Sequence, residues 1–252
     1  MNTVEFAGKA IAVTGAASGL GRAASIRFAN EGGKLCLIDL NQRGLEETAA
    51  SITGAGGECV IVAGDLGEPA NCKVAVAAAI EAFGRLDVLC NVAGILRFHA
   101  LEQVTPADWD RLFSANVSSA FFMMQAAMPH LIEAEGNVVN VVSTASFLGQ
   151  AYTAPYAATK SALLSLTKSL AMEFMHQPVR INALAPGGML TEMVADLEFP
   201  EQADQTLIAR YIGLRPPSQP GDIVESLLFL ASDRAKSVHG ACIMADNGIT
   251  AG

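Results

Sequence analysis

The sequence AIAVTGAASGLG at residues 10–21 joins a short apolar run to a turn that contains three glycines. A helical pattern begins directly after this turn, so we expect a buried strand to pass through the turn into a helix. Glycines let the backbone turn tightly and approach a pyrophosphate, while the helix N-terminus offers free N–H donors and a positive dipole end. The stretch therefore indicates a dinucleotide site, but because glycine turns are common, the rest of the chain must support that interpretation.

Short apolar runs alternate with longer helical patterns along the chain. Unbroken apolar runs are typical of a parallel sheet covered by helices on both faces. No repeat or linker divides the sequence, so we predict one α/β domain over residues 1–252: a Rossmann fold with a doubly wound, seven-stranded parallel sheet. The predicted strands are residues 10–14, 35–39, 59–63, 88–91, 138–143, 180–185 and 241–245. The predicted helices include residues 20–30, 71–83, 107–133, 156–175 and 223–232.

The composition excludes several classes of protein. Apolar residues make up 51% of the 252 residues and charged residues 16%, as in a globular protein. No stretch reaches the roughly 18 uncharged apolar residues of a membrane helix, and the N-terminus does not resemble a secretory signal. A net charge of −9 disfavours nucleic acid and anionic membranes as partners. Five scattered cysteines indicate reduced thiols rather than a metal site, so we expect a cytoplasmic protein with a small-molecule ligand.

Asp39 closes the second predicted strand, eighteen residues after Gly21. An acid at this position can accept hydrogen bonds from adenosine ribose hydroxyls and would repel a 2′-phosphate. No Arg or Lys lies between the glycines of the turn, and none follows Asp39 before Arg43. These features favour NAD(H) over NADP(H), although an acid at a strand end can also be an ordinary turn residue.

The spacing T-G-x-x-x-G-x-G resembles that of the short-chain dehydrogenases/reductases, and the resemblance runs from about residue 8 to residue 245. Further motifs similar to those of the family are D-L at 65–66, N-V-A-G at 91–94, P-G-G-M-L-T at 186–191 and a looser D-N-G at 246–248. Val92 replaces the family's second Asn, which leaves Asn91 and Gly94 in place. The resemblance implies that NAD(H) is held by Gly15, Ser18, Gly19, Leu20, Gly21, Asp39, Leu40, Asp65, Leu66, Asn91, Ala93, Gly94, Tyr156, Lys160, Pro186, Gly187, Met189 and Thr191.

Tyr156 and Lys160 lie four residues apart in a helical pattern, so their side chains project from one face about a turn apart. Such a pair is usually an ordinary amphipathic pair, but here it follows a serine-ended strand in a chain with a dinucleotide turn. The thirteen residues from Ser143 to Tyr156 are the spacing of the family's catalytic serine and tyrosine, with Ser146 as a nearby alternative. Asn116 is similar to the family asparagine that supports a water between the lysine and solvent. The resemblance implies a catalytic tetrad of Asn116, Ser143, Tyr156 and Lys160.

The chemistry expected of this tetrad depends on the pKa of Tyr156, because an unperturbed tyrosine has a pKa near 10 and is a poor base at neutral pH. An ammonium about 4.5 Å away, at an effective dielectric constant of about 20, would favour the phenolate by roughly 3–4 kcal/mol. We therefore expect Lys160 to lower the pKa of Tyr156 to about 7, where general acid/base catalysis is most efficient. Ser143 would hold the substrate oxygen, and hydride would pass between the substrate carbon and the nicotinamide.

Residues 187–217 form an unusually long connection, which we interpret as a substrate loop or lid, the alternative being a helical excursion on the surface. Substrate contacts are predicted for Ser143, Phe147, Tyr156 and Met193, within a wider set of Leu96, Phe98, His99, Leu148, Tyr152, Met189 and Leu197. These side chains could equally be core or lid packing. Because they are mostly apolar and the only cation among the neighbouring residues is Arg97, a neutral, hydrophobic secondary alcohol or ketone is the predicted substrate.

Two other functions stay open. An NADPH-dependent reductase of the 3-oxoacyl-carrier-protein type should have a basic residue in the glycine turn or after the second strand, and a basic patch for its acidic carrier. A non-catalytic NAD-binding sensor would not need the complete tetrad. By analogy with the family, we expect a homotetramer or a homodimer with helices 107–133 and 156–175 at an interface.

Overall fold

The computed structural model describes residues 4–191 and 198–251 of the chain. In these ranges, seven parallel strands form one sheet in the order β3-β2-β1-β4-β5-β6-β7. The strands are β1 (Ala10–Thr14), β2 (Lys34–Asp39), β3 (Glu58–Ala63), β4 (Val88–Asn91), β5 (Asn137–Val141), β6 (Arg180–Pro186) and β7 (Cys242–Ala245). Because β1 pairs with β2 on one side and with β4 on the other, the direction of winding reverses between β1 and β4. The predicted doubly wound parallel sheet is confirmed.

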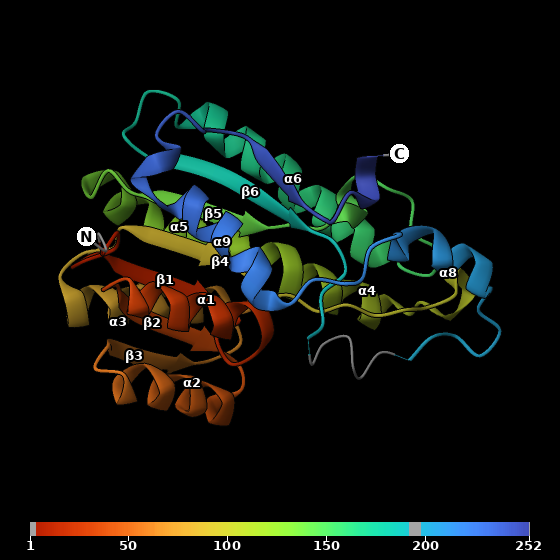
Figure 1. The fold of residues 1–252 in the computed structure, drawn as a ribbon, viewed down its shortest axis with the longest axis horizontal. Coiled ribbons are helices and arrows are strands. Elements are labelled where there is room, and N and C mark those ends of the chain that lie inside the picture. Colours follow the sequence, from red (N-terminus) through yellow and green to blue (C-terminus); the bar gives the residue numbers. More distant parts are fainter. Residues whose placement is uncertain (1–3, 192–197, 252) are drawn as a thin grey trace.

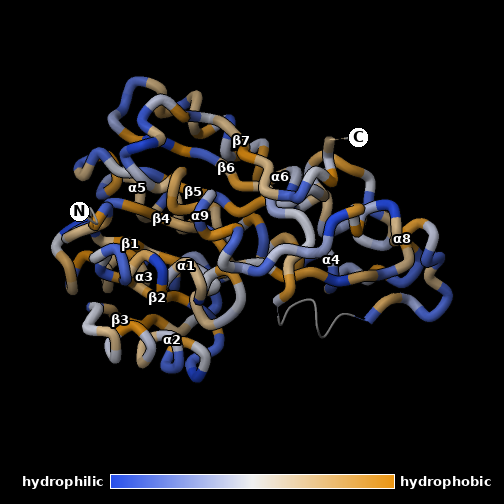
Figure 2. The backbone as a smooth tube through the Cα atoms, in the orientation of Figure 1, coloured by the Kyte–Doolittle hydropathy of each residue, from blue (hydrophilic) through white to orange (hydrophobic). Residues whose placement is uncertain are grey.

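Helices cover both faces of this sheet (Figure 1). On one face lie α1 (Gly19–Asn30), α2 (Gln42–Gly54) and α9 (Pro220–Ala231), and on the other α3 (Pro69–Phe83), α5 (Ser119–Glu133) and α6 (Ala154–Glu173). Figure 2 shows the hydrophobic residues concentrated along the strands and the hydrophilic ones on the outer surfaces of the helices. Burial of both faces of the sheet explains why its strands are nearly continuous apolar runs.

The predicted helix at 107–133 is divided into three parts. It consists of α4 (Pro106–Phe113), a π-helical turn at Ser114–Ser118, and α5. Thr105 caps α4, its side-chain oxygen accepting a hydrogen bond from the backbone N–H of Asp108 at 3.2 Å. Single π turns inside helices often occur at functional sites, and this one contains the buried Asn116.

Two helices were missing from the predicted elements. The first is α2, whose N-cap Asn41 accepts a hydrogen bond from the backbone N–H of Gly44. The second is α8 (Gln205–Ile212), inside the long connection at 187–217, with Asp204 as its N-cap. Both begin with a recognisable capping residue, so the capping pattern could have revealed them.

The fifth strand ends at Val141, two residues before the predicted end. Ser143 therefore follows the strand instead of closing it, and it caps a short 3₁₀ turn at Thr144–Ser146. The hydroxyl of Ser143 accepts a hydrogen bond from the backbone N–H of Ala145 at 3.1 Å. A serine that offers the backbone such a local partner favours a turn over continuation of a strand.

The carboxyl ends of the strands all point to the same edge of the sheet, beyond which α4 and α8 lie (Figure 1). Ligands of doubly wound sheets bind at this edge. Among the described residues, no helix is long and apolar enough to span a membrane.

Candidate active site

A cleft of about 630 Å³ lies at the carboxyl ends of the strands. It runs from Asp39 at the end of β2 to Ser143 after β5, with the ends of β1 and β4 between them. Of the residues predicted to hold the cofactor, all but Asn91 line this cleft. The structure therefore brings together motifs that are spread from residue 15 to residue 191.

The cleft also contains residues that the sequence interpretation missed: Gly64, Gly67, Val92, Ile95, Arg111, Ser114, Ala115, Ser119, Val141 and Val142. Gly64 and Gly67 flank the D-L motif, so the motif itself could have pointed to them. Arg111 and its neighbours reach the cleft only because α4 and the π turn cross the end of the sheet. Arg111 is the one cation besides Lys160 in the described lining of the cleft.

The glycine turn is packed so closely that side chains cannot replace two of its glycines. A Cβ atom on Gly21 would lie 2.0 Å from the carbonyl oxygen of Gly15, and one on Gly15 would lie 2.9 Å from the backbone nitrogen of Ala93. The hydroxyl of Thr14 ties the turn to the end of β4, since it accepts hydrogen bonds from the N–H groups of Val92 and Ala93, each at 3.0 Å. The turn and the N-V-A-G segment thus form one continuous backbone cradle.

Asp39 is held at the end of β2 by the backbone around it. One of its carboxylate oxygens accepts a hydrogen bond from the N–H of Ala17 in the glycine turn at 3.2 Å, and the other accepts one from the N–H of Asn41 at 2.9 Å. The nearby Arg22 does not face the cleft, because its guanidinium pairs with Glu47 at 3.0 Å and also donates to the carbonyl of Ala17. The carboxylate of Asp39 therefore lies at the cleft wall, and in the described part of the chain it forms no ion pair with a cation.

Ser143, Tyr156 and Lys160 line the same wall of the cleft. The Lys160 side chain is 4% exposed, and its Nζ donates a hydrogen bond to the carbonyl oxygen of Val141 at 2.9 Å. Nζ lies 5.9 Å from the centroid of the Tyr156 ring. A Cβ atom on Gly94 would lie 3.2 Å from Nζ, so the absence of a side chain there leaves space beside the lysine.

The pKa of Tyr156 differs from the sequence-based expectation. Burial raises the pKa of Tyr156, and a hydrogen bond with Ser143 opposes this by lowering it. Burial also lowers the pKa of Lys160 to about 8. The predicted fall in the Tyr156 pKa toward neutrality is therefore not found in the chain by itself, because desolvation of the phenolate outweighs the effect of Ser143.

Asn116 lies behind the cleft wall and is 1% exposed. Its amide group binds both backbone groups of Ile95, accepting from the N–H at 2.7 Å and donating to the carbonyl at 3.0 Å. It also donates to the hydroxyl of Thr159 on α6 at 3.0 Å. The side chain thus joins the π turn, the segment after β4 and the helix that carries Tyr156.

Asn91, unlike the other predicted cofactor residues, is buried beneath the cleft. Its amide nitrogen donates to the side-chain oxygen of Asn140 on β5 at 2.8 Å, and Asn140 in turn donates to the hydroxyl of Thr167 on α6 at 2.9 Å. Within the described part of the chain, the side-chain oxygen of Asn91 has no hydrogen-bond partner. Asn91 therefore supports the sheet and α6, and the cleft reaches only its neighbours.

The two serine candidates are distinguished by their surroundings. Ser143 lines the cleft with Tyr156, and its hydroxyl lowers the pKa of the Tyr156 phenol. The hydroxyl oxygen of Ser146 is buried away from the cleft, and the described residues give it no partner. This geometry favours Ser143.

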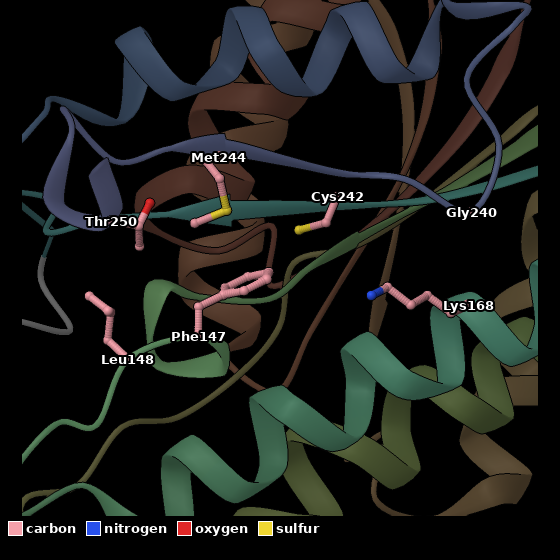
Figure 3. A pocket seen from close by; sticks show the side chains of 7 residues that line it. All are labelled: Phe147, Leu148, Lys168, Gly240, Cys242, Met244 and Thr250. Atoms are coloured by element: carbon pink, nitrogen blue, oxygen red, sulfur yellow. The ribbon is translucent and has the colours of Figure 1, made fainter. Parts of the chain in front are cut away.

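The predicted substrate contacts do not all line the cleft. Ser143, Tyr156 and Met189 line the cleft. Phe147, which is 47% exposed, lines a second hollow of about 590 Å³ with Cys242 and Met244 of β7, toward which its ring points (Figure 3). Met193 and Leu197 lie outside the described residues.

No group of three or more metal-binding side chains occurs among the described residues. All five cysteines are free thiols. Burial raises the pKa of Cys36 to about 12 and that of Cys72 to about 11. Thiols with such pKa values are poor nucleophiles at neutral pH.

Comparison with known proteins covers nearly the whole chain. The family model described as enoyl-(acyl carrier protein) reductase matches residues 15–250. A 2,5-dichloro-2,5-cyclohexadiene-1,4-diol dehydrogenase of Sphingobium indicum is 36% identical over 248 residues, which are 98% of each chain. A crystal structure of a short chain dehydrogenase from Mycobacterium paratuberculosis bound to NAD has a TM-score of 0.91 and 26% identity, covering 98% of this chain and 100% of that one. Another, from Burkholderia cenocepacia in complex with NADP, has a TM-score of 0.88 and 27% identity, covering 98% and 99%.

Proposed function

The chain belongs to the short-chain dehydrogenase/reductase family of oxidoreductases, and on that premise we propose that it interconverts a secondary alcohol and a ketone with NAD(H). The observation that carries this proposal is a single cleft lined both by Asp39 and by Ser143, Tyr156 and Lys160. A nucleotide site and a set of proton-transfer groups thus share one cavity.

The residues of the cleft fit a nicotinamide dinucleotide. The close backbone approach at Gly15 and Gly21 leaves N–H groups at the start of α1 for a diphosphate, and Asp39 can accept hydrogen bonds from ribose hydroxyls. The bare Cα of Gly94 leaves room beside Lys160. When bound, the nicotinamide would accept or supply the hydride.

The carboxylate of Asp39 is our reason for proposing NAD(H) over NADP(H). A 2′-phosphate would bring a second negative charge close to this carboxylate, and the guanidinium of Arg22, which contacts the glycine turn at Ala17, is paired with Glu47. Arg111 is a cation in the same cleft, but it lies on α4, which follows β4 in the chain.

In the proposed mechanism, the residues of this chain hold the substrate oxygen and move one proton. Ser143 donates a hydrogen bond to that oxygen as negative charge develops on it. In reduction, the neutral phenol of Tyr156 gives its proton to the oxygen, and the raised pKa keeps the phenol protonated at neutral pH. In oxidation, Tyr156 must first lose its proton, and the protonated Lys160 stabilises the phenolate.

We propose that the substrate is neutral and largely apolar. The side chains next to Tyr156 along the cleft include Ile95, Val142 and Met189, and the only described cations in the cleft are Lys160 and Arg111. One relative is named as the dehydrogenase of a cyclic diol. That name supports our proposal of a cyclic alcohol as a substrate of this chain.

An NADPH-dependent reductase acting on carrier-bound acyl groups is the second candidate. The description of the matching family model and the NADP-bound structural relative favour it. The basic residue expected in the glycine turn is missing, and the net charge of −9 would repel an acidic carrier. A non-catalytic sensor is the third candidate.

One assay separates these candidates. The purified chain is mixed with NAD⁺ or NADP⁺ and with cyclohexanol, cyclohexane-1,2-diol or 1-phenylethanol, and reduced cofactor is followed at 340 nm. We expect turnover with NAD⁺ and at least one alcohol, and little with NADP⁺. Turnover with NADP⁺ alone would favour the second candidate, whereas NADH binding without any turnover would favour a sensor.

The family analogy also leads us to propose a homotetramer, or a homodimer, as the assembly. Analytical ultracentrifugation checks this directly, because a monomer would sediment with the 26.2 kDa mass of a single chain.

A further inference from the structure

Two tyrosines outside the tetrad join α8 to the segment that leads into the catalytic helix α6. The hydroxyl oxygen of Tyr152 accepts a hydrogen bond from the backbone N–H of Asp204 at 2.8 Å. The hydroxyl of Tyr211 donates a hydrogen bond to the backbone carbonyl of Ala151 at 3.0 Å. The two contacts run in opposite directions between the same two segments, so each segment supplies one tyrosine. We call this pair of contacts the tyrosine latch.

The backbone of Tyr152 has an unusual conformation. Its φ angle is +66°, in the left-handed region that aromatic residues rarely adopt. The carbonyl of Tyr152 accepts a hydrogen bond from the backbone N–H of His99 at 2.8 Å, which ties the strained residue to the segment after β4. Backbone strain of this kind persists only where surrounding contacts require it. Tyr152 lies four residues before Tyr156 in the chain. Its strained backbone accompanies the contact between its hydroxyl and Asp204.

The latch also gives the first residue of the α8 cap a partner within the protein. Asp204 is the N-cap of α8, and its carboxylate accepts a hydrogen bond from the N–H of Thr206. Because an N-cap precedes the first helical turn, its own N–H has no partner within the helix. Tyr152 supplies that partner. A third contact, between the rings of Phe98 and Phe199 with centroids 4.4 Å apart, joins the segment before α8 to the segment after β4.

We propose that Tyr152 and Tyr211 are positioning residues that hold α8, a helix of the connection that supplies Met189 and Thr191 to the cleft, and so determine how tightly an alcohol binds beside Tyr156. This inference rests on the proposed function for its substrate. The two tyrosines act through α8, because neither lines the cleft that contains Ser143 and Lys160. They should therefore influence the KM of the alcohol and leave the cofactor site unaffected.

The first test is independent of substrate and cofactor. Hydrogen–deuterium exchange is measured on the purified chain and on Tyr152→Phe, Tyr211→Phe and a control, Ser51→Ala, which removes an exposed hydroxyl on α2. We expect exchange of the Asp204 amide to rise about fivefold in Tyr152→Phe, the effect of losing one ordinary hydrogen bond. The decisive variant is Tyr211→Phe, because the hydroxyl that it removes binds the carbonyl of Ala151 and not Asp204. Its exchange at Asp204 should also rise, because α8 is held as one body.

The second test uses the alcohol with the highest kcat/KM in the panel above. Both Tyr→Phe variants should raise its KM about fivefold, with kcat changed less than twofold and the dissociation constant of NADH unchanged. Ser51→Ala should alter none of these values.

Unchanged exchange at Asp204 in Tyr211→Phe would mean that the contacts are independent surface bonds, and the latch would be refuted. Unchanged KM in both variants, with faster exchange, would refute the role in substrate positioning. If no alcohol is turned over at all, the proposed function fails, and the exchange measurement still decides whether the latch exists.

Discussion

The two ends of the cleft are built in different ways. The cofactor end consists of backbone at the ends of β1, β2 and β4, held by hydrogen bonds to the Thr14 hydroxyl and the Asp39 carboxylate and resting on largely buried strands. The substrate end contains Ile95, Ser143 and Tyr156, and the segments connected to them, 95–100, 147–153 and 198–212, include a strained Tyr152 and the partly exposed Phe199. Side-chain contacts between distant segments hold this end together.

The difference follows from what each end has to recognise. A diphosphate is bound by N–H groups that every residue carries, so a local glycine pattern is sufficient to specify the site. A substrate is distinguished by side chains, which loops on a rigid scaffold can vary without cost to the core. Substitutions at the cofactor end should therefore lower the stability of the chain or its affinity for the cofactor. Substitutions at the substrate end should lower the turnover rate or the selectivity among substrates.

The largest effect is expected at the reacting atoms. Tyr156→Phe removes the proton donor and acceptor, so turnover should fall about 10³-fold, within the range for loss of a general acid/base. Steady-state kinetics at saturating cofactor and alcohol checks this. The dissociation constant of NADH, measured by fluorescence, should stay within twofold of the original. A variant with more than a tenth of the original turnover would contradict the role of Tyr156.

The next largest effect compares the hydrophobic core that supports the glycine turn with the segments connected to the substrate end. Phe28 on α1 is fully buried and packs edge-to-face against Phe6 with ring centroids 4.8 Å apart. Phe28→Ala should lower the free energy of unfolding by about 3–5 kcal/mol. Phe199→Ala, at a residue that is 42% exposed, should lower it by about 1 kcal/mol or less. Urea denaturation checks both, and equal losses would remove the contrast between the ends.

A smaller effect concerns the choice of cofactor. Asp39→Asn keeps the size of the side chain and removes its charge, so the preference for NAD⁺ over NADP⁺, expressed as a ratio of kcat/KM values, should fall roughly 10- to 100-fold. The control is Asp65→Asn, which removes the other described carboxylate of the cleft. We expect it to change the ratio less than threefold. If the Asp65 variant changed the ratio more than the Asp39 variant, the discrimination would lie at the D-L segment and not at Asp39.

The smallest effect concerns the buried lysine. Its pKa of about 8 lies below the ordinary 10.5 of an unfolded chain, so between these pH values the unfolded chain binds more protons and stability rises with pH. Below pH 8 the full cost of the buried charge is present. At pH 7, Lys160→Met should therefore stabilise the chain by about 1–2 kcal/mol, after allowance for the lost bond to Val141.

Urea denaturation at pH 7 and pH 10 measures this difference. The advantage of Lys160→Met should shrink at pH 10, where the original lysine is neutral in the folded chain. Turnover should be lost at both pH values. A variant less stable than the original at pH 7 would show that burial of Lys160 costs little.

Sequence patterns were sufficient wherever a local signal reports a local structure. The strands were predicted within one or two residues because both faces of the sheet are buried, and the turn at Gly15–Gly21 was recognised because its glycines have no steric alternative. The boundary at Ser143 was less accurate, since a serine can either end a strand or cap a turn. The placement of Phe147 in a separate hollow could not be foreseen, because it depends on where β7 packs.

Local sequence patterns were enough to predict the seven strands, the glycine-rich turn, the position of Asp39 and the four-residue spacing of Tyr156 and Lys160. These depend on steric limits and helical periodicity within a few neighbouring residues. Only the tertiary structure decided that Asn116 clamps Ile95 to α6, that Arg22 is paired with Glu47, and that α8 meets Tyr152. The same structure raised the pKa of Tyr156, because desolvation depends on every segment that covers a side chain and not on its neighbours in the chain.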